Sequence, residues 1–137
     1  MPAGYSKRSL VDKLGIKPNS RVAIVNKPDG YDATLGALPD GVRPQRKATP
    51  DLDFIQAFYT DAKKLERDFP ALKKAIKQNG VLWISWPKKA AKMETDVTET
   101  VVRDIGLGCG LVDIKVCAVD EVWSGLKFMY RLKDRDV

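Results

Sequence analysis

The stretch Val81-Leu82-Trp83-Ile84-Ser85-Trp86 decides the fold. No charged residue interrupts it, and a short uninterrupted apolar run is typical of a strand covered on both faces of a parallel sheet. Pro87 ends the run, because proline has no N–H group to donate to a neighbouring strand. Asn79-Gly80 comes directly before it and predicts a left-handed turn that ends a helix. We therefore expect a central strand that follows a helix.

The helix before this strand is recognised by the spacing of its apolar residues. They recur every three or four positions, which places them on one face of a helix. These residues are Leu65, Phe69, Leu72 and Ile76. Thr60 is expected to cap the start of the helix, with Asp61 in its first turn. Pro70 is expected to kink or restart the helix before it ends near Gln78.

Two more apolar runs predict strands earlier in the chain. Residues 21–26 are RVAIVN and residues 53–59 are DFIQAFY, and turn residues bound both runs. A short helix is expected between them over residues 31–38. Residues 42–48 predict only a weak edge strand, because Pro44 cannot donate to a sheet and the surrounding residues are polar.

The last third of the chain has a different pattern. Asp96 and Glu99 have the spacing of a capping box, which predicts a helix that continues to about Ile105 and is ended by glycines. Apolar residues then alternate over residues 111–119 and again over residues 125–132. Alternation predicts two strands, and the short connection makes them an antiparallel pair.

Strands that alternate with helices predict an α/β fold. We expect a three-layer sandwich with a mostly parallel sheet and one antiparallel strand near the C-terminus. A further helix at residues 6–14 belongs to an N-terminal helical extension, residues 1–20. No linker divides residues 1–137 into two domains.

The composition excludes several classes of protein. The chain has 137 residues, 44% of them hydrophobic, which is enough for one domain with a buried core. It has no histidine, which excludes Ser-His-Asp and Cys-His triads and most zinc sites. Cys109 and Cys117 predict neither a disulfide framework nor a metal site. No apolar run has the length of a membrane span and no leader pattern is present, so we expect a cytoplasmic protein without a membrane partner.

Two parts of the sequence carry a resemblance to known proteins. Residues 72–84, with the C-terminal strand pair, resemble the class I methyltransferase form of the Rossmann-like sheet, over about residues 21–132. This implies a truncated version of that topology, with one strand and one helix missing between Ala48 and Asp53. The whole chain also resembles a family of small bacterial proteins of uncharacterised function. The matching segments are Gly4-Tyr5-Ser6, Lys13-Leu14-Gly15-Ile16-Lys17-Pro18, Trp86-Pro87-Lys88-Lys89 and Val112 to Phe128.

Because of the methyltransferase resemblance, the sequence can be checked for the residues that would bind the cofactor. Binding of S-adenosylmethionine in that fold needs a glycine-rich turn after the first strand and an acidic residue after the second, as in dinucleotide sites. Here Asn26-Lys27-Pro28-Asp29-Gly30 takes the place of the turn after the first strand, and the second strand ends in Lys47-Ala48-Thr49, with no acid before Asp51. We therefore expect no S-adenosylmethionine and no other cofactor, with a minimal S-adenosylmethionine-dependent methyltransferase as the alternative.

Ligands in an open α/β sheet bind outside the carboxyl ends of the strands. The residues of interest are therefore polar and aromatic side chains directly after the predicted strands. The candidate ligand-binding residues are Asn26, Lys27, Tyr59, Thr60, Ser85, Trp86, Lys88, Lys89, Asp120 and Trp123. Asp51 and Asp53 precede their strand and are interpreted as solubilising turn residues. No catalytic or metal-ligating residue is assigned.

Two of these segments each have two interpretations. The ammonium groups of Lys88 and Lys89, beside the ring of Trp86, suit a phosphate or carboxylate ligand, or else they belong to a solvated loop. Trp123 walls a ligand pocket or a partner surface, or else it fills the core beneath the hairpin connection.

The formal net charge of +6 leaves three functions open. The first is a non-catalytic methyltransferase-like domain that binds an anionic small molecule or a protein partner. The second is the minimal methyltransferase. The third is weak nucleic-acid binding through phosphate contacts on the basic outer side of the long helix, although acidic residues interrupt that side. The basic residues there are Lys63, Lys64, Arg67, Lys73, Lys74 and Lys77.

Overall fold

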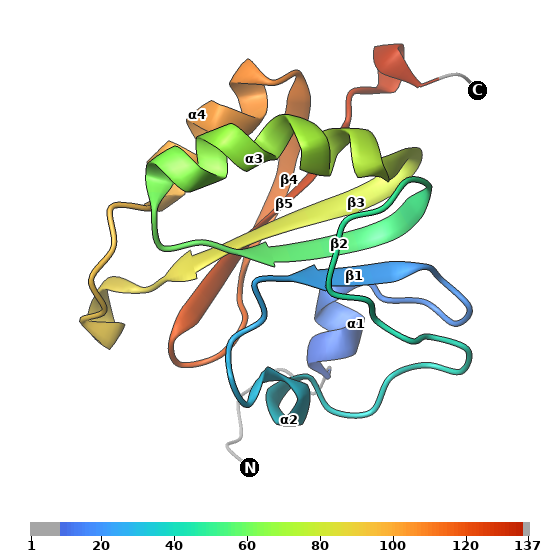
Figure 1. Cartoon of the computed structure of the whole chain (residues 1–137), viewed down its shortest axis with the longest axis horizontal. Helices are drawn as coiled ribbons and strands as arrows, with labels where there is room; N and C mark the ends of the chain where they lie inside the picture. The colour runs from blue at the N-terminus through green and yellow to red at the C-terminus, as the bar shows by residue number, and fades with distance from the viewer. Residues whose placement is uncertain (1–8, 136–137) are drawn as a thin grey trace.

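Figure 1 shows the computed structural model of the protein, which describes residues 9–135. The strands are β1 (Val22–Val25), β2 (Leu52–Phe58), β3 (Ile76–Pro87), β4 (Leu111–Ala118) and β5 (Trp123–Tyr130). They form one sheet in the order β1-β2-β3-β5-β4. β1, β2 and β3 pair in parallel, whereas β5 is antiparallel to both β3 and β4. One reversed strand near the C-terminus was predicted and is confirmed.

Helices cover both faces of this sheet. They are α1 (Leu10–Leu14), α2 (Tyr31–Leu35), α3 (Ala62–Ala75) and α4 (Glu99–Gly108), with short 3-10 helices η1 (Lys89–Ala91) and η2 (Leu132–Asp134). α3 and α4 lie together above the sheet in Figure 1, and α1 and α2 lie below it. The predicted three-layer α/β sandwich is therefore confirmed. The predicted start of the first helix at Ser6 lies outside the described residues.

Within residues 9–135, no helix is long and apolar enough to cross a membrane.

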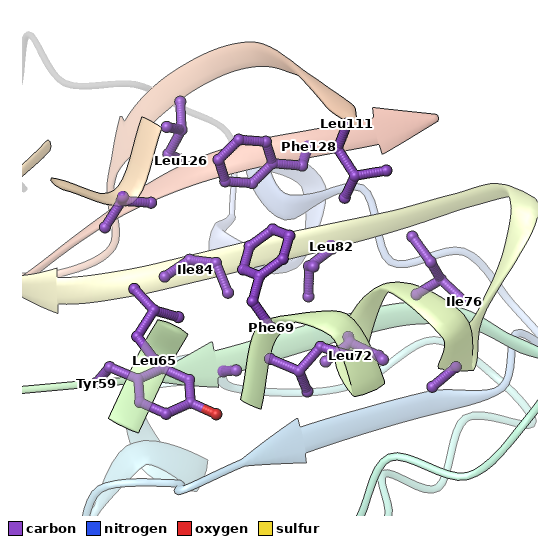
Figure 2. Close-up of a cluster of buried hydrophobic side chains, with 14 of the residues drawn as sticks. Tyr59, Leu65, Phe69, Leu72, Ile76, Leu82, Ile84, Leu111, Leu126 and Phe128 are labelled. Atoms are coloured by element: carbon purple, nitrogen blue, oxygen red, sulfur yellow. The ribbon is translucent and has the colours of Figure 1, made fainter. Parts of the chain in front are cut away.

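The face of the sheet under α3 and α4 carries a continuous apolar cluster (Figure 2). Phe69 of α3 and Phe128 of β5 meet edge to face, with ring centroids 5.6 Å apart. Gly106 of α4 permits this packing, because a Cβ atom at that position would clash with the ring of Phe128. The cluster also contains Tyr59, Leu65, Leu72, Ile76, Leu82, Ile84, Leu111 and Leu126. The predicted apolar stripe of the long helix is thus the side that faces the core.

The opposite face is covered by two helices of five residues each, α1 and α2. The indole N–H of Trp83 donates a hydrogen bond to the carbonyl of Leu14 at 2.9 Å, which ties α1 to the middle of β3. The ring of Phe58 meets the rings of Tyr31 and Trp123 edge to face, at 4.8 Å and 5.0 Å between centroids. Isolated helices this short are not stable, so these tertiary contacts hold them in place.

The junction between α3 and β3 differs from the prediction. The helix ends three residues before Gln78 and the strand begins at once, so the predicted left-handed turn at Asn79-Gly80 is wrong. Sheet pairing is the reason, because Ile76 already pairs with Leu52 and the register shifts before regular pairing resumes at Val81. The glycine instead lies at a close approach, since a Cβ atom there would lie 3.0 Å from the carbonyl oxygen of Lys77 and 3.1 Å from that of Leu52.

Both predicted caps of the long helices are wrong. Asp61, not Thr60, caps α3, because its carboxylate accepts hydrogen bonds at 2.9 Å and 3.2 Å from two backbone N–H groups of the first turn. Thr98, not Asp96, caps α4. The carboxylate of Asp96 instead accepts the backbone N–H at the start of α3, at 2.7 Å. Pro70 does not restart α3, which runs through it without a break.

The predicted strand at residues 42–48 is reduced to a single bridge. Gln45 pairs in parallel with Ala23, on the side of β1 that faces away from β2. Pro44 cannot extend the pairing because it lacks an N–H group. The chain therefore visits one side of β1 and then returns to form β2 on the other side. Such a reversal of strand order is where open α/β sheets bind ligands.

β4 forms one edge of the sheet. Its apolar residues are more exposed than their alternating pattern in the sequence predicted. Ile114 and Val116 are 46% and 44% exposed. A register shift between Asp113 and Lys115 interrupts the pairing with β5. A bulge of this kind breaks the alternation of faces, so the apolar residues of β4 do not form one buried row.

Candidate functional site

Three hollows lie along the carboxyl ends of the parallel strands. The first, which we call the β1 hollow, has a volume of about 520 Å³ and surrounds the loop at residues 26–30. The β2 hollow, of about 230 Å³, lies at the end of β2. The β3 hollow, of about 660 Å³, lies at the end of β3. The β1 and β2 hollows share Asn26 and Pro28, so they are adjacent.

The β1 hollow has an excess of positive charge. The ammonium group of Lys27 lies 3.0 Å from the carboxylate of Asp32, so these two charges neutralise each other. Arg46 and Lys47 follow the bridge to β1 and line the same hollow with exposed side chains. Neither forms an ion pair within the described part of the chain. Asp29 is the remaining carboxylate in the lining.

The loop at the base of the β1 hollow is a tight turn. Asn26 and Gly30 both have left-handed backbone conformations, with φ of 56° and 80°. The backbone N–H of Tyr31 donates to the carbonyl of Pro28 at 3.1 Å and closes the turn. Pro28 lines both the β1 and the β2 hollow. Because proline has no N–H group, the backbone offers no donor to a ligand at that point.

The β2 hollow brings together four of the candidate residues, namely Asn26, Tyr59, Thr60 and Trp123. The side-chain amide of Asn26 donates to the carbonyl of Phe58 at 3.1 Å and ties the β1 loop to β2. The hydroxyl of Tyr59 donates to Asp68 at 2.8 Å. Burial, followed by this carboxylate, raises the pKa of Tyr59 above its ordinary value. Trp123 packs on Phe58 and is only 8% exposed, so it fills the core and walls the hollow as well.

The β3 hollow brings together Trp86, Lys88 and Lys89. The ammonium group of Lys88 donates to the backbone carbonyl of Asp120 at 2.6 Å, so it is already occupied within the protein. Lys89 is exposed and forms no ion pair among the described residues. Glu99 places a negative charge at the start of α4 in the same lining. The lining therefore offers an anion the ammonium group of Lys89 and the opposing carboxylate of Glu99.

Asp120 and Thr60 shape the rim through hydrogen bonds within the protein. One carboxylate oxygen of Asp120 accepts the backbone N–H groups of Val122 and Trp123, both at 2.8 Å, and so fixes the turn between β4 and β5. The carbonyl of Thr60 accepts the hydroxyl of Thr95 at 2.8 Å, which joins the end of β2 to the segment before α4.

Ser85 lies in the core on the α1 and α2 side. Its hydroxyl accepts a hydrogen bond from the amide of Gln56 at 3.2 Å, and the amide oxygen of Gln56 accepts one from the hydroxyl of Tyr31 at 2.6 Å. All three residues are buried. Burial is the main cause that raises the pKa of Tyr31 above its ordinary value. Because Tyr31 is the first residue of α2, this hydrogen-bonded chain fixes the end of the loop that forms the β1 hollow.

The sequence did not predict Tyr31, Arg46, Lys47 and Gln56 as parts of the site. The signal for Gln56 was a polar residue inside an otherwise apolar strand, which must find a hydrogen-bond partner when buried. The signal for Arg46 was its position near the end of the weak edge strand expected over residues 42–48, 20 residues after Asn26. Lys27, although predicted, is neutralised by Asp32.

The described residues give little evidence for a metal site or a reactive thiol. Among residues 9–135, no group of three His, Cys, Asp or Glu side chains could hold a metal ion. Cys109 and Cys117 are both half-buried thiols, and burial raises the pKa of Cys117.

Comparison with known proteins supports the architecture. No family model and no curated protein matches the sequence. A SAM-dependent methyltransferase from Aquifex aeolicus matches with a TM-score of 0.64 and 18% identity, over 89% of this chain and 88% of that chain. The DhpI–SAH complex matches with a TM-score of 0.62 and 11% identity, over 90% and 83%. This chain has the class I methyltransferase fold.

The class I methyltransferase fold was predicted from the sequence and is thereby confirmed. A further match is precorrin-6y C5,15-methyltransferase from Geobacter metallireducens, with a TM-score of 0.61 and 10% identity, over 89% and 86%. At identities this low the likeness shows the fold alone. The function must be argued from the side chains of the site.

Proposed function

We propose that the protein binds a phosphate-bearing small molecule in the β1 hollow and does not transfer a methyl group. The supporting observation is the pair of cations, Arg46 and Lys47, that line this hollow without an ion-pair partner among the described residues. In dinucleotide sites an acidic residue about 20 residues beyond the first turn binds the ribose, whereas an arginine nearby accommodates a phosphate on that ribose. Arg46 follows Asn26 by 20 positions.

The size and charge of the β1 hollow suit such a ligand. Its volume of about 520 Å³ lies within the range of roughly 300–1,000 Å³ that small-molecule sites occupy. Lys27 and Asp32 cancel each other, which leaves two cations against Asp29. A guanidinium group can bind a phosphate through two parallel hydrogen bonds, and a lysine adds a point charge.

A minimal S-adenosylmethionine-dependent methyltransferase is the second candidate function, and the shared fold favours it. The residues of this chain do not fit that cofactor. Pro28 stands between the β1 and β2 hollows, and no glycine-rich turn precedes it. Arg46 and Lys47 stand where the fold would need an acid for the ribose hydroxyls. We therefore derive no methyl-transfer step.

Charge reversal in the β1 hollow tests the proposal. Calorimetric titration with ADP should show binding to the wild-type protein, and R46E/K47E should lower the affinity at least tenfold, which is about 1.4 kcal/mol. K74E/K133E is the matched control, because it removes the same charge at exposed positions outside the three hollows. The control should bind ADP within a factor of two of wild type. An equal loss in both variants, or no ADP binding by the wild type, contradicts the proposal.

A further inference from the structure

A second group of cations lies on the α1 side of the sheet. β5 pairs Lys127 with Trp83, and the indole of Trp83 bonds to the last residue of α1. Paired residues on adjacent strands share a face, so Lys127 lies on the α1 side. β4 pairs Lys115 with Lys127. Two lysine side chains are therefore directly opposite each other on neighbouring strands of the same face.

This arrangement is unfavourable for the isolated protein. Like charges on directly opposed residues repel each other. Burial, and then the charges of Lys115 and Lys17, lower the pKa of Lys127. None of these three lysines forms an ion pair within residues 9–135.

The same cations border a hollow at the amino ends of the strands, far from the three hollows of the candidate site. Lys17 and Lys127 line this hollow, which has a volume of about 470 Å³. Its carboxylate, Asp53, is already engaged, because it lies 3.1 Å from the ammonium of Lys77 and accepts the backbone N–H of Arg21 at 2.8 Å. The positive charge of the two lysines is thus not compensated by Asp53.

The positive surface extends from this hollow along the edge of the sheet. Lys115 lies opposite Lys127 on β4, which is the edge strand of the sheet. We call Lys17, Lys127 and Lys115 the lysine patch. Several neighbouring ammonium groups without an ion-pair partner among the described residues can neutralise successive phosphates of a nucleic-acid strand.

We propose that the lysine patch binds the phosphodiester backbone of a nucleic acid, without reading its sequence. On the basic side of α3, which the sequence indicated for this role, three of the six cations are already engaged. Arg67 pairs with Asp68 at 3.0 Å, Lys77 pairs with Asp53, and the ammonium of Lys73 donates to the carbonyl of Cys109 at 2.7 Å. Cations that are already partnered gain less from a phosphate.

Fluorescence anisotropy with a labelled 20-base-pair DNA duplex of arbitrary sequence tests this proposal. K115Q/K127Q should weaken binding at least tenfold at low salt. It should also reduce the slope of log affinity against log salt by about 1.8, because roughly 0.9 counterion is released per neutralised phosphate. K63Q/K74Q on α3 is the matched control and should lose less than threefold. Thermal unfolding checks that both variants remain folded.

Several results would overturn the inference. They are equal losses in the two double variants, an unchanged salt slope in K115Q/K127Q, and no duplex binding by the wild type. Binding to phosphatidylserine vesicles in place of the duplex, lost in K115Q/K127Q, would instead identify a membrane surface and would also contradict it. The R46E/K47E variant should still bind the duplex, and K115Q should still weaken that binding. The reason is that the β1 hollow and the lysine patch have no residue in common.

Discussion

The two faces of the sheet are held together by different interactions. Under α3 and α4 the contact is apolar and centred on the rings of Phe69 and Phe128 (Figure 2). Under α1 and α2 the helices are short, and a buried chain of hydrogen bonds joins Tyr31, Gln56 and Ser85. Both faces bury an apolar cluster, which on the second face includes Phe58, Trp83 and Trp123. The second face also fixes the loop that forms the β1 hollow, so stability and binding should respond to different substitutions.

Phe69→Ala should have the largest effect on stability. The ring is fully buried, and its removal leaves a cavity, so the free energy of unfolding should fall by about 3–5 kcal/mol. ADP affinity of the folded fraction should not change, because Phe69 contacts none of the three hollows. Urea unfolding and calorimetry measure the two quantities. A weaker ADP affinity in the folded variant would show that the faces are not independent.

Tyr31→Phe should have an intermediate effect on stability and should also reach the binding site. It leaves the amide oxygen of Gln56 without its donor inside the core, which costs about 1–3 kcal/mol. ADP affinity should fall as well, because Tyr31 anchors the start of α2 beside the loop. Tyr130→Phe is the control, since that hydroxyl donates to the carbonyl of Lys73 on the other side of the sheet. If both variants bind ADP like the wild type, Tyr31 has no positioning role.

The smallest effect is on the pH dependence of stability, and it comes from the hydrogen-bonded carboxylate of Asp68 on α3. Burial opposes ionisation of Asp68, but hydrogen bonds from Arg67 and Tyr59 outweigh it and lower the pKa of this carboxyl. Because the pKa of Asp68 is lower in the folded state, its ionisation stabilises the folded protein at pH values above the unfolded pKa of about 3.9. This stabilisation is lost as the pH falls through the folded pKa.

Wild-type stability should therefore drop below about pH 4 by more than that of Asp68→Asn, with a difference of about 0.2–1 kcal/mol for this partly exposed pair. Urea unfolding at pH 3 and pH 7 measures it. Identical pH profiles of the two proteins would show that Asp68 does not contribute.

The fold could be predicted from the sequence because buried apolar residues recur with the period of the helix or strand that carries them. The apolar run at residues 81–86 and the stripe at Leu65, Phe69 and Leu72 correspond to β3 and the inner side of α3. Errors occurred where pairing at a distance overrides local preference. Gly80 serves a close approach to β2, and Asp96 caps a helix other than its own.

The candidate site was harder to predict, because its chemistry depends on which polar groups are already partnered. Lys27 and Lys88 have the residue type of an anion site, but Asp32 and the carbonyl of Asp120 engage them. Arg46 and Lys47 were placed in a weak strand, and only the single bridge of Gln45 to β1 shows that they reach the hollow. Ser85 lies near the carboxyl end of β3, where ligands bind in open α/β sheets, but its side chain is buried in the core.

We propose that the β1 hollow recognises phosphate and excludes an adenosyl cofactor. Calorimetric titration of the wild-type protein with ADP and with S-adenosylhomocysteine tests it most directly, because the two molecules share adenosine and differ in the group attached to it. We expect ADP to bind and S-adenosylhomocysteine to show no heat of binding. Tighter binding of S-adenosylhomocysteine than of ADP would contradict the account.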